Sequence, residues 1–455
     1  MTKCLSCCAV VFSLSLMASS VPEIRADVSL PKVLSSHMVL QRERPLPIWG
    51  WADPGEEVTV RLDDATATTK AGAKGDWKVV LPAMKADGKA HRMTISGKNK
   101  VALDDILIGE VWIGSGQSNM EMGISACDKA NEQVRAANYP DIRLLLVPKK
   151  SVAVSAKDVQ ADWVGCSPKT VATGGWGGFS AALFFFGQRL HKELGVPVGL
   201  IDSSWGGSPI EPWTVSGEKA GGMYNGMIAP VKPLAIRGAI WYQGEANVGN
   251  GLKYYDKMKA LIEGWRKAWG YDFAFYFVQL APFSGYGPGS LPPLWEAQVA
   301  SLKIPGTGMA VITDLVGNLK DIHPKNKLDV GNRLALWALA KDYGKTDLVH
   351  SGPLYKSMKI AGGKIHLSFA HVDGGLKSRD GKPLTEFEIA GADGKFVPAE
   401  ATIDGSTVVV QAKTVALPTQ VRFGWRNEAN PNLVNKEGLP ASPFQTNHWQ
   451  GGTGE

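Results

Sequence analysis

Ser118 stands at a turn whose residue types suit nucleophilic chemistry. Residues 106–113 are mostly apolar, which predicts a buried strand, and Gly114 and Gly116 then permit a sharp turn into a helix. At such a turn a serine hydroxyl is open to a substrate, and backbone N–H groups at the helix start can stabilise an oxyanion. The alternative is that Ser118 only caps the helix, because serine is a preferred capping residue.

His323 is the histidine best placed to act as a base. Of the eight histidines, it alone falls in a loop after a predicted strand, here residues 309–313. The others lie in the flanking regions or on a predicted helix: His37, His91, His191, His350, His366, His371 and His448. Asp321 is close enough in sequence to orient the imidazole, which is what a serine nucleophile requires. Asp321 could instead cap the helix predicted over residues 325–343.

Two further loops offer hydrogen-bond donors. The strand expected over residues 198–202 leads into Gly206 and Gly207, where a backbone N–H can approach a ligand closely. The strand expected over residues 239–242 leads into Gln243, Glu245 and Asn247, which add amides and a carboxylate. Ligands of open parallel sheets bind beyond the carboxyl ends of the strands, so these loops are expected to meet at one site.

The middle of the chain predicts an α/β domain with a largely parallel sheet, because strand-like and helix-like stretches alternate from residue 106 to residue 349. We expect strands over residues 106–113, 142–147, 198–202, 239–242, 273–279 and 309–313. We expect helices over residues 119–137, 180–194, 254–269, 295–302 and 325–343. Residues 151–178 lack periodicity and are expected to form a long loop over the sheet.

Both flanking regions predict small β-sandwich-like domains. Residues 27–105 and 350–455 contain short alternating runs separated by turn residues such as Asp404-Gly405. Tryptophans of the first region could face a sugar, but their period-two spacing favours the core.

Composition and the first 26 residues limit which class of protein this chain can be. The chain has 455 residues, 44% of them hydrophobic, and a net charge of +6, which predicts a globular protein of two or three domains. Its basic residues are dispersed, so we expect no nucleic-acid partner. Residues 1–26 combine Lys3, an apolar stretch over residues 4–18 and small residues, the pattern of a signal peptide. We therefore expect a secreted or periplasmic protein without a membrane span in the mature chain.

Two cysteines, Cys127 and Cys166, would remain after removal of the signal peptide. They either pair in an oxidising compartment or lie as two buried thiols. The mature chain retains no Cys-x-x-Cys or His-rich spacing, so no metal site is expected.

Three blocks resemble those of a known family: residues 109–120 (GEVWIGSGQSNM), 241–247 (WYQGEAN) and 321–327 (DIHPKNK). They are similar to the blocks of bacterial sialate O-acetylesterases, which are SGNH hydrolases with a flavodoxin-like α/β domain. Residues 38–42 and 438–444 resemble the flanking regions of the same family, so the likeness covers nearly the whole mature chain.

The resemblance implies a role for each candidate residue. Ser118 matches the nucleophile, and its own backbone N–H is the first oxyanion donor. Gly206, or alternatively Gly207, would give a second N–H, and the Asn247 side chain would give the third donor. His323 matches the general base.

The third triad member is left open by the resemblance. SGNH enzymes usually place an acid three residues before the histidine, and that position is Lys320 here. Asp321 is our first choice, with Glu245 and Asp314 as alternatives. The implied chemistry is removal of O-acetyl groups from sialic acids through an acetyl-enzyme, without a metal or organic cofactor. Alternatives are an acetylxylan or other polysaccharide esterase of the same mechanism, or a non-catalytic carbohydrate-binding protein.

Overall fold

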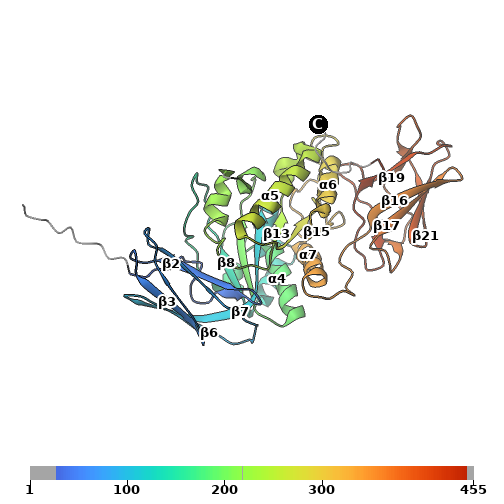
Figure 1. Ribbon diagram of the computed structural model, residues 1–455. Helices are drawn as coiled ribbons and strands as arrows, with labels where there is room; N and C mark the ends of the chain where they lie inside the picture. Colours follow the sequence, from blue (N-terminus) through green and yellow to red (C-terminus); the bar gives the residue numbers. More distant parts are fainter. Residues whose placement is uncertain (1–26, 218, 448–455) are drawn as a thin grey trace, which may run out of the picture.

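The computed structural model describes residues 27–217 and 219–447 in three consecutive parts (Figure 1). A β region at the start of the chain is drawn in blue, an α/β region follows in cyan to orange, and a second β region in red ends the described chain. The predicted signal peptide and His448 lie outside the described residues.

The central sheet is parallel and carries all six strands that the sequence predicted. Its order is β15-β14-β13-β7-β10-β8, with β9 (Val164–Cys166) pairing antiparallel to β8 at one edge. The strands are β7 (Lys100–Gly116), β8 (Tyr139–Leu146), β10 (Val198–Ser204), β13 (Gly238–Tyr242), β14 (Ala274–Val278) and β15 (Thr307–Ala310). Their carboxyl ends therefore share one edge of the sheet.

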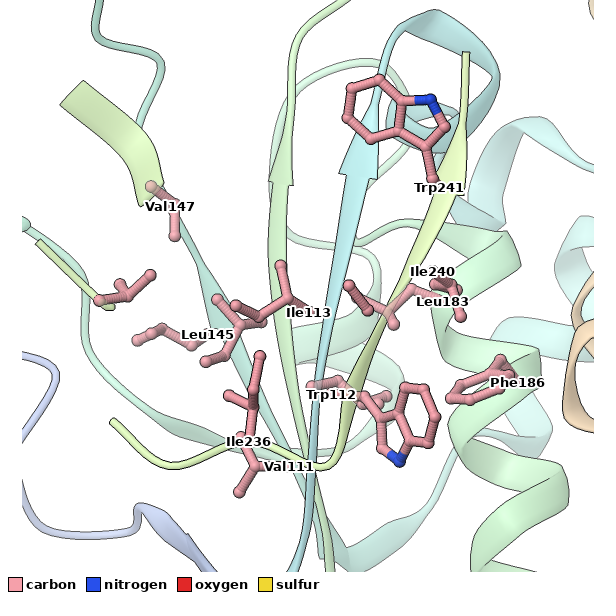
Figure 2. Packing of buried hydrophobic residues seen from close by; sticks show 14 of the residues in the cluster. Val111, Trp112, Ile113, Leu145, Val147, Leu183, Phe186, Ile236, Ile240 and Trp241 are labelled. Carbon is pink, nitrogen blue, oxygen red and sulfur yellow. The ribbon is translucent and has the colours of Figure 1, made fainter. Parts of the chain in front are cut away.

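Helices cover both faces of this sheet. Trp112 of β7 packs against Phe186 of α4, as Figure 2 shows, whereas Trp241 of β13 packs against Trp265 of α5. Trp112 pairs with Gly238, three residues before Trp241, so the two indoles project to opposite faces. The four long helices are α4 (Ala181–Leu194), α5 (Tyr254–Trp269), α6 (Leu291–Ala300) and α7 (Lys327–Lys341).

The helix expected over residues 119–137 is wrong, because the chain there is broken into three short pieces. These are α1 (Ser118–Glu121), a 3-10 turn (Ile124–Ala126) and α2 (Ala130–Ala136). Gly123 lies directly against Gly177, where a Cβ on Gly123 would stand 2.3 Å from a backbone atom. Packing of the long loop over residues 151–178 against this segment thus prevents a continuous helix.

The first β region is joined to the central sheet by one strand, β7. In it, β3 (Glu57–Leu62) pairs with β4 (Ala65–Lys70) and β6 (His91–Ser96), and β6 pairs with the first half of β7. The second half of β7 lies in the central sheet, so β7 crosses the expected junction at residues 105 and 106. The domain limits stay predictions.

The tryptophans of the first β region divide between two faces. Strand β2 (Leu46–Trp51) pairs with β5 (Asp76–Leu81). Trp77 is buried as expected, and its ring fills the space left by Gly50. Trp49 and Trp51 are only half-buried, so the core expectation is wrong for them, because they lie on the alternate face of β2.

Two four-stranded sheets share a core in the second β region. One contains β16 (Leu354–Ala361), β17 (Lys364–Ala370), β22 (Thr407–Gln411) and β21 (Glu400–Asp404). The other contains β20 (Val397–Pro398), β19 (Phe387–Ala390), β23 (Gln420–Phe423) and β25 (Phe444–Gln445). The hairpin expected at Asp404-Gly405 is confirmed, since Asp404 pairs with Thr407.

The remaining elements are short. The strands are β1 (Val39–Gln41), β11 (Val215–Ser216), β12 (Lys219–Ala220), β18 (Leu376–Ser378) and β24 (Leu433–Asn435). The helical pieces are α3 (Pro168–Val171), the 3-10 turns Glu211–Trp213, Glu245–Lys253 and Ser301–Lys303, and a π-helical turn, Tyr224–Ile228. Within residues 27–217 and 219–447, no helix combines the length and apolarity needed to traverse a bilayer.

Cys127 and Cys166 are buried free thiols. Burial raises the pKa of Cys127 to about 11 and that of Cys166 to about 12. Both side chains therefore stay protonated and unreactive at neutral pH.

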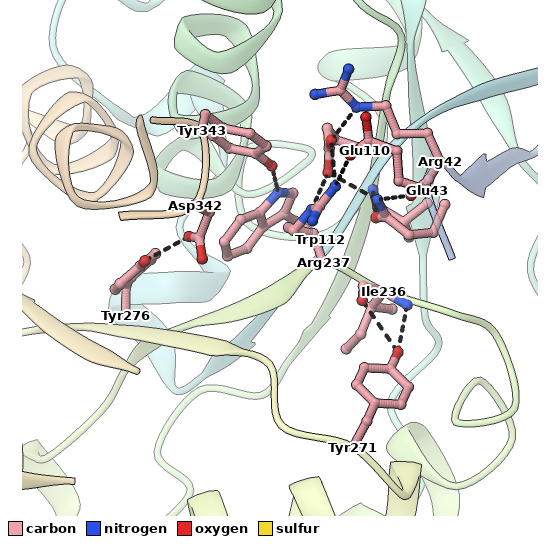
Figure 3. Close-up of polar contacts among 12 residues, drawn as sticks. Arg42, Glu43, Glu110, Trp112, Ile236, Arg237, Tyr271, Tyr276, Asp342 and Tyr343 are labelled. Atoms are coloured by element: carbon pink, nitrogen blue, oxygen red, sulfur yellow. Dashed lines mark hydrogen bonds and ion pairs between the residues drawn. The ribbon is translucent and has the colours of Figure 1, made fainter. Parts of the chain in front are cut away.

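A buried carboxylate on β7 links the residue after β1 to the residue before β13. Glu110 of β7 is fully buried and accepts hydrogen bonds from Arg42 and Arg237, as Figure 3 shows. Burial raises the pKa of the Glu110 carboxyl, but the two guanidinium groups more than offset this, so the pKa lies below its ordinary value. This ion-pair cluster fixes the start of β13 against β7, at the sheet edge opposite to Ser118.

We expect Gly116→Ala to destabilise the fold strongly. Gly116 has φ +134°, and a Cβ there would stand 2.2 Å from the carbonyl oxygen of Tyr242. Backbone strain and overpacking together should lower the free energy of unfolding by roughly 2–5 kcal/mol. Gly88→Ala is the matched control, because Gly88 also has positive φ but open space around it, so strain alone costs about 1–2 kcal/mol. Equal denaturant midpoints for the two variants would contradict the close approach.

Candidate active site

The turn after β7 places Ser118 at the carboxyl edge of the sheet. The Gln117 N–H donates to the Tyr242 carbonyl at 3.0 Å, which ties the turn to the end of β13. The buried Gln117 side chain also accepts from the Gln243 amide at 3.1 Å. These two bonds hold the first residue of α1, Ser118, in a fixed position.

Ser118 and His323 are in direct contact, although 205 residues separate them. The Ser118 Oγ and the His323 Nε2 lie 2.9 Å apart, within reach for proton transfer. On the other side of the ring, Asp321 Oδ1 lies 3.7 Å from His323 Nδ1 and accepts the backbone N–H of His323 at 2.9 Å. Asp321 therefore fixes the loop and supplies negative charge beside the imidazole.

The indole of Trp176 packs against the imidazole of His323. Trp176 comes from the long loop and meets the His323 ring edge to face, with centroids 4.7 Å apart. Its side chain is 43% exposed, so one side of the indole remains available to a bound molecule.

The pKa of His323 lies below its ordinary value of 6.5. Burial is the largest cause, the Lys327 cation lowers the pKa further, and the Asp321 carboxylate opposes both by raising it. A lowered pKa keeps the imidazole neutral at physiological pH, which is the form that accepts a proton from serine.

The two alternative acids face other partners. Asp314 forms a double hydrogen bond with Arg333, both contacts at 2.6 Å. Glu245 accepts from the Asn119 amide at 2.5 Å, and burial raises its pKa. Of the three candidate carboxylates, only Asp321 lies within 4 Å of His323 Nδ1 in the described residues.

A buried polar network lies beneath the Ser118 turn. Lys327 is fully buried, donates to the Asn119 Oδ1 at 2.5 Å and lies 4.9 Å from the centre of the Tyr242 ring. Burial lowers the pKa of Lys327 to about 7, with the charge of Glu245 opposing. The Asn119 amide also donates to the Ile322 carbonyl at 2.9 Å. The neighbour of Ser118 thus binds the neighbour of His323.

Gly206 lies beside Ser118, but its N–H has a partner. A Cβ on Gly206 would stand 3.5 Å from the Ser118 Cβ, so the two backbones are adjacent. The Gly206 N–H donates to Glu121 Oε2 at 2.5 Å, and Glu121 forms an ion pair with Lys149 at 2.6 Å. Gly207, the alternative donor, has positive φ and open space around it.

Asn247 is buried within its own network. Its amide donates to both carboxylate oxygens of Glu211 at 3.2 Å and to Asn250 at 2.8 Å. Its carbonyl oxygen accepts from the Gln243 amide at 2.7 Å and the Ile210 N–H at 2.9 Å. The oxyanion-donor role of Asn247 stays a prediction and requires that its amide leave these partners.

Two adjoining cavities open beside His323. Their volumes are about 600 Å³ and about 210 Å³, and both are lined by Asp128, Asp321, His323 and Lys325. The larger one also contacts Trp176 and Lys129. This space is large enough for a monosaccharide beside His323, the residue that contacts Ser118.

Sequence reasoning did not single out Glu121, Lys149 or Lys327. Glu121 and Lys149 carry no motif of their own, and their importance appears only when α1 meets the Gly206 loop. The spacing of Lys327 on α7 gave a partial signal, since a lysine among the buried positions of a helix is unusual.

Comparisons with known proteins give a consistent family. A family model described as carbohydrate esterase, sialic acid-specific acetylesterase matches residues 108–339. The sialate O-acetylesterase of Pongo abelii is 31% identical, with 90% of this chain and 91% of that protein covered, and that of Homo sapiens is 30% identical with the same coverage. A crystal structure of a carbohydrate acetylesterase from Xanthomonas citri has a TM-score of 0.87 at 40% identity, covering 93% of this chain and 100% of that chain.

We expect Asp321→Asn to lower kcat without unfolding the protein. The variant keeps the shape of the side chain but removes the charge beside His323, and the 3.7 Å separation and partial exposure predict a loss of roughly 10- to 100-fold. Glu245→Gln tests the buried alternative and should cost less. Asp314→Asn, which breaks an ion pair away from the imidazole, is the structural control. A larger kcat loss for either of these two would assign the third role elsewhere.

The pH dependence of kcat/KM should report the charges around His323. Because the neutral imidazole is the active form and its pKa is lowered, activity should fall on the acid side only below pH 6.5. Asp321→Asn removes a group that raises this pKa and should move the acid limb to lower pH. Lys327→Met removes a group that lowers it and should move the limb to higher pH, provided near-UV circular dichroism shows a folded protein. Shifts in the same direction would exclude this electrostatic account.

Proposed function

Because the chain belongs to the family of sialic acid-specific carbohydrate acetylesterases, we propose that it removes O-acetyl groups from sialic acids through an acetyl-enzyme on Ser118. The observation that carries this proposal is the 2.9 Å contact between the Ser118 hydroxyl and the His323 imidazole beside an open cavity. The family resemblance drawn from the three sequence blocks is confirmed by the comparisons.

The proposed reaction has two steps. His323 takes the hydroxyl proton of Ser118 as the oxygen attacks the acetyl carbonyl, and then returns that proton to the departing sugar alcohol. Water activated by the same imidazole hydrolyses the acetyl-enzyme and releases acetate. Asp321 stabilises the imidazolium that forms in each step, since its carboxylate is the negative charge nearest to Nδ1.

The oxyanion donors we propose are the backbone N–H groups of Ser118 and Gly206 and the amide of Asn247. Each such donor is worth roughly 3 kcal/mol at the transition state. The Gly206 N–H becomes available when the Glu121 carboxylate gives way to the substrate oxyanion, and Lys149 can retain Glu121 during that exchange.

The fold supports a finer assignment to the SGNH hydrolases. Leaving out β8, the parallel strands run in the order β10-β7-β13-β14-β15, which is the flavodoxin-like order 2-1-3-4-5. We further propose sandwich-like flanking domains over residues 27–105 and 350–455 and a catalytic domain over residues 106–349. Removal of residues 1–26 as a signal peptide would give a secreted or periplasmic enzyme.

The cavity beside His323 supports an acidic sugar as substrate. Lys129 and Lys325 line it together with Asp128 and Asp321, and within the described residues neither ammonium group forms an ion pair with a carboxylate, so both can turn to a ligand. A sialic acid carries a carboxylate that these cations can bind, whereas acetylated xylan offers no such charge on its xylose units. A polysaccharide O-acetylesterase of the same mechanism is the second candidate, favoured by the likeness to the Xanthomonas citri carbohydrate acetylesterase.

Acetate release from O-acetylated sialic acid and from acetylated xylan, measured side by side, tests the function. We expect faster turnover of the sialic acid and a loss of at least about 10³-fold in Ser118→Ala. Lys325→Met should raise KM for the acidic substrate and leave KM for acetylated xylan unchanged, because only the former carries the charge. Equal activity of wild type and Ser118→Ala on p-nitrophenyl acetate would end the esterase assignment, and preference for xylan would select the second candidate.

A further inference from the structure

A second cleft, of about 420 Å³, lies far from Ser118, between the first β region and the central domain. One wall is the outer face of the two-stranded sheet formed by β2 and β5. Trp49 pairs with Lys78 and Pro47 pairs with Val80, so these four side chains stand together on the same face. Trp49 is half-buried and Val80 is 53% exposed, so this face is open to the cleft.

The opposite wall is formed by Trp269 at the end of α5, by Tyr271 just after it, and by Lys232. The Trp269 indole N–H donates to the Leu234 carbonyl at 3.0 Å. The Tyr271 hydroxyl accepts the Ile236 N–H at 3.0 Å and donates to the Ile236 carbonyl at 3.2 Å, as Figure 3 shows. Both rings are therefore held in place before any ligand arrives, which lowers the entropic cost of binding.

Three cations face this cleft, and no described residue of its lining carries a negative charge. The Arg44 guanidinium stacks 4.3 Å above the Tyr271 ring, and its Nε is buried without a hydrogen-bond partner. Within residues 27–217 and 219–447, the side chains of Lys78 and Lys232 take part in no ion pair or hydrogen bond. The lining contains no aspartate or glutamate, and the nearby Glu43 is engaged by Arg237.

The composition of the cleft specifies the chemistry of its ligand. The indole faces of Trp49 and Trp269 suit the C–H faces of a pyranose ring, while the guanidinium of Arg44 and the two ammonium groups suit a carboxylate. A ligand with both features neutralises the positive charge of the Arg44, Lys78 and Lys232 side chains that line the cleft. We propose that this cleft is a second, non-catalytic carbohydrate site that binds a sugar residue carrying a carboxylate, such as a uronic acid.

The location of the cleft separates it from catalysis. Ile236 precedes the amino end of β13, whereas Tyr242 at the carboxyl end adjoins the Ser118 turn. The cleft and the catalytic residues therefore lie at opposite edges of the sheet. An acidic glycan bound in the cleft stays attached to the enzyme while its acetylated residues are hydrolysed at Ser118.

Titration of the full chain with D-glucuronate and with D-glucose, followed by ligand-observed NMR, tests the proposal. The two sugars differ only in the carboxylate at C6, so we expect glucuronate to bind at least 10-fold more tightly. The double variant Lys78→Glu/Lys232→Glu should weaken glucuronate binding at least 10-fold. Lys70→Glu/Lys74→Glu has the same change in net charge at exposed positions of the same β region and should leave it unchanged. Trp49→Ala should weaken binding of both sugars.

Two controls separate the cleft from other anion sites. Hydrolysis of p-nitrophenyl acetate should be the same in wild type and in the cleft variants, and Lys325→Met, which changes the catalytic cavity, should retain the glucuronate binding that Lys78→Glu/Lys232→Glu loses. Unchanged glucuronate affinity in the Lys78→Glu/Lys232→Glu variant, or a loss confined to Lys325→Met, would overturn the proposal. Inorganic sulfate binding as tightly as glucuronate would likewise overturn it, because a simple anion site does not use the aromatic walls.

Discussion

The approach of β7 to the end of β13 is the constraint on which the catalytic arrangement depends. Gly116 passes so close to the Tyr242 carbonyl that only a residue without a side chain fits there. The next residue, Gln117, then donates its N–H to that same carbonyl, and Ser118 follows at the start of α1. The position of the hydroxyl is thus fixed by backbone contacts between two central strands, which are among the least mobile parts of a fold.

The base reaches Ser118 from a loop that lies outside the sheet, and a side-chain network ties this loop to the Ser118 turn. Asn119 provides this, because its amide binds the Ile322 carbonyl while its oxygen accepts from Lys327 at the start of α7. Burying these polar groups is unfavourable unless each one forms a hydrogen bond. The network therefore permits only one arrangement of the loop relative to Ser118. The same lysine lowers the pKa of His323, so positioning and electrostatics are coupled in one network.

The sequence predicted what depends on local pattern and missed what depends on distant contacts. The strands and the helix over residues 254–269 follow from apolar runs and helical periodicity, and the structure confirms them. The helix expected over residues 119–137 fails because Gly123 packs on a loop more than fifty residues away. The half-exposed face of Trp49 depends on register with β5, and the pairing of Glu121 with the Gly206 N–H depends on two loops meeting. Neither feature can be read from a short stretch of sequence.

The two edges of the central sheet differ in how their buried charges are paired. The edge with paired charges is structural, and the other edge carries the catalytic residues. At the amino edge, the fully buried Glu110 carboxylate pairs with the partly exposed guanidinium groups of Arg42 and Arg237, which compensates the buried charge and locks the strands together. At the carboxyl edge, Lys327 is buried with a single hydrogen-bonded partner and a lowered pKa, and His323 remains partly open to the cavity. A buried charge without a full set of partners lowers the stability of the fold. Folds retain such charges at sites where a proton must move. The uncompensated edge is therefore the one at which the serine and the imidazole meet.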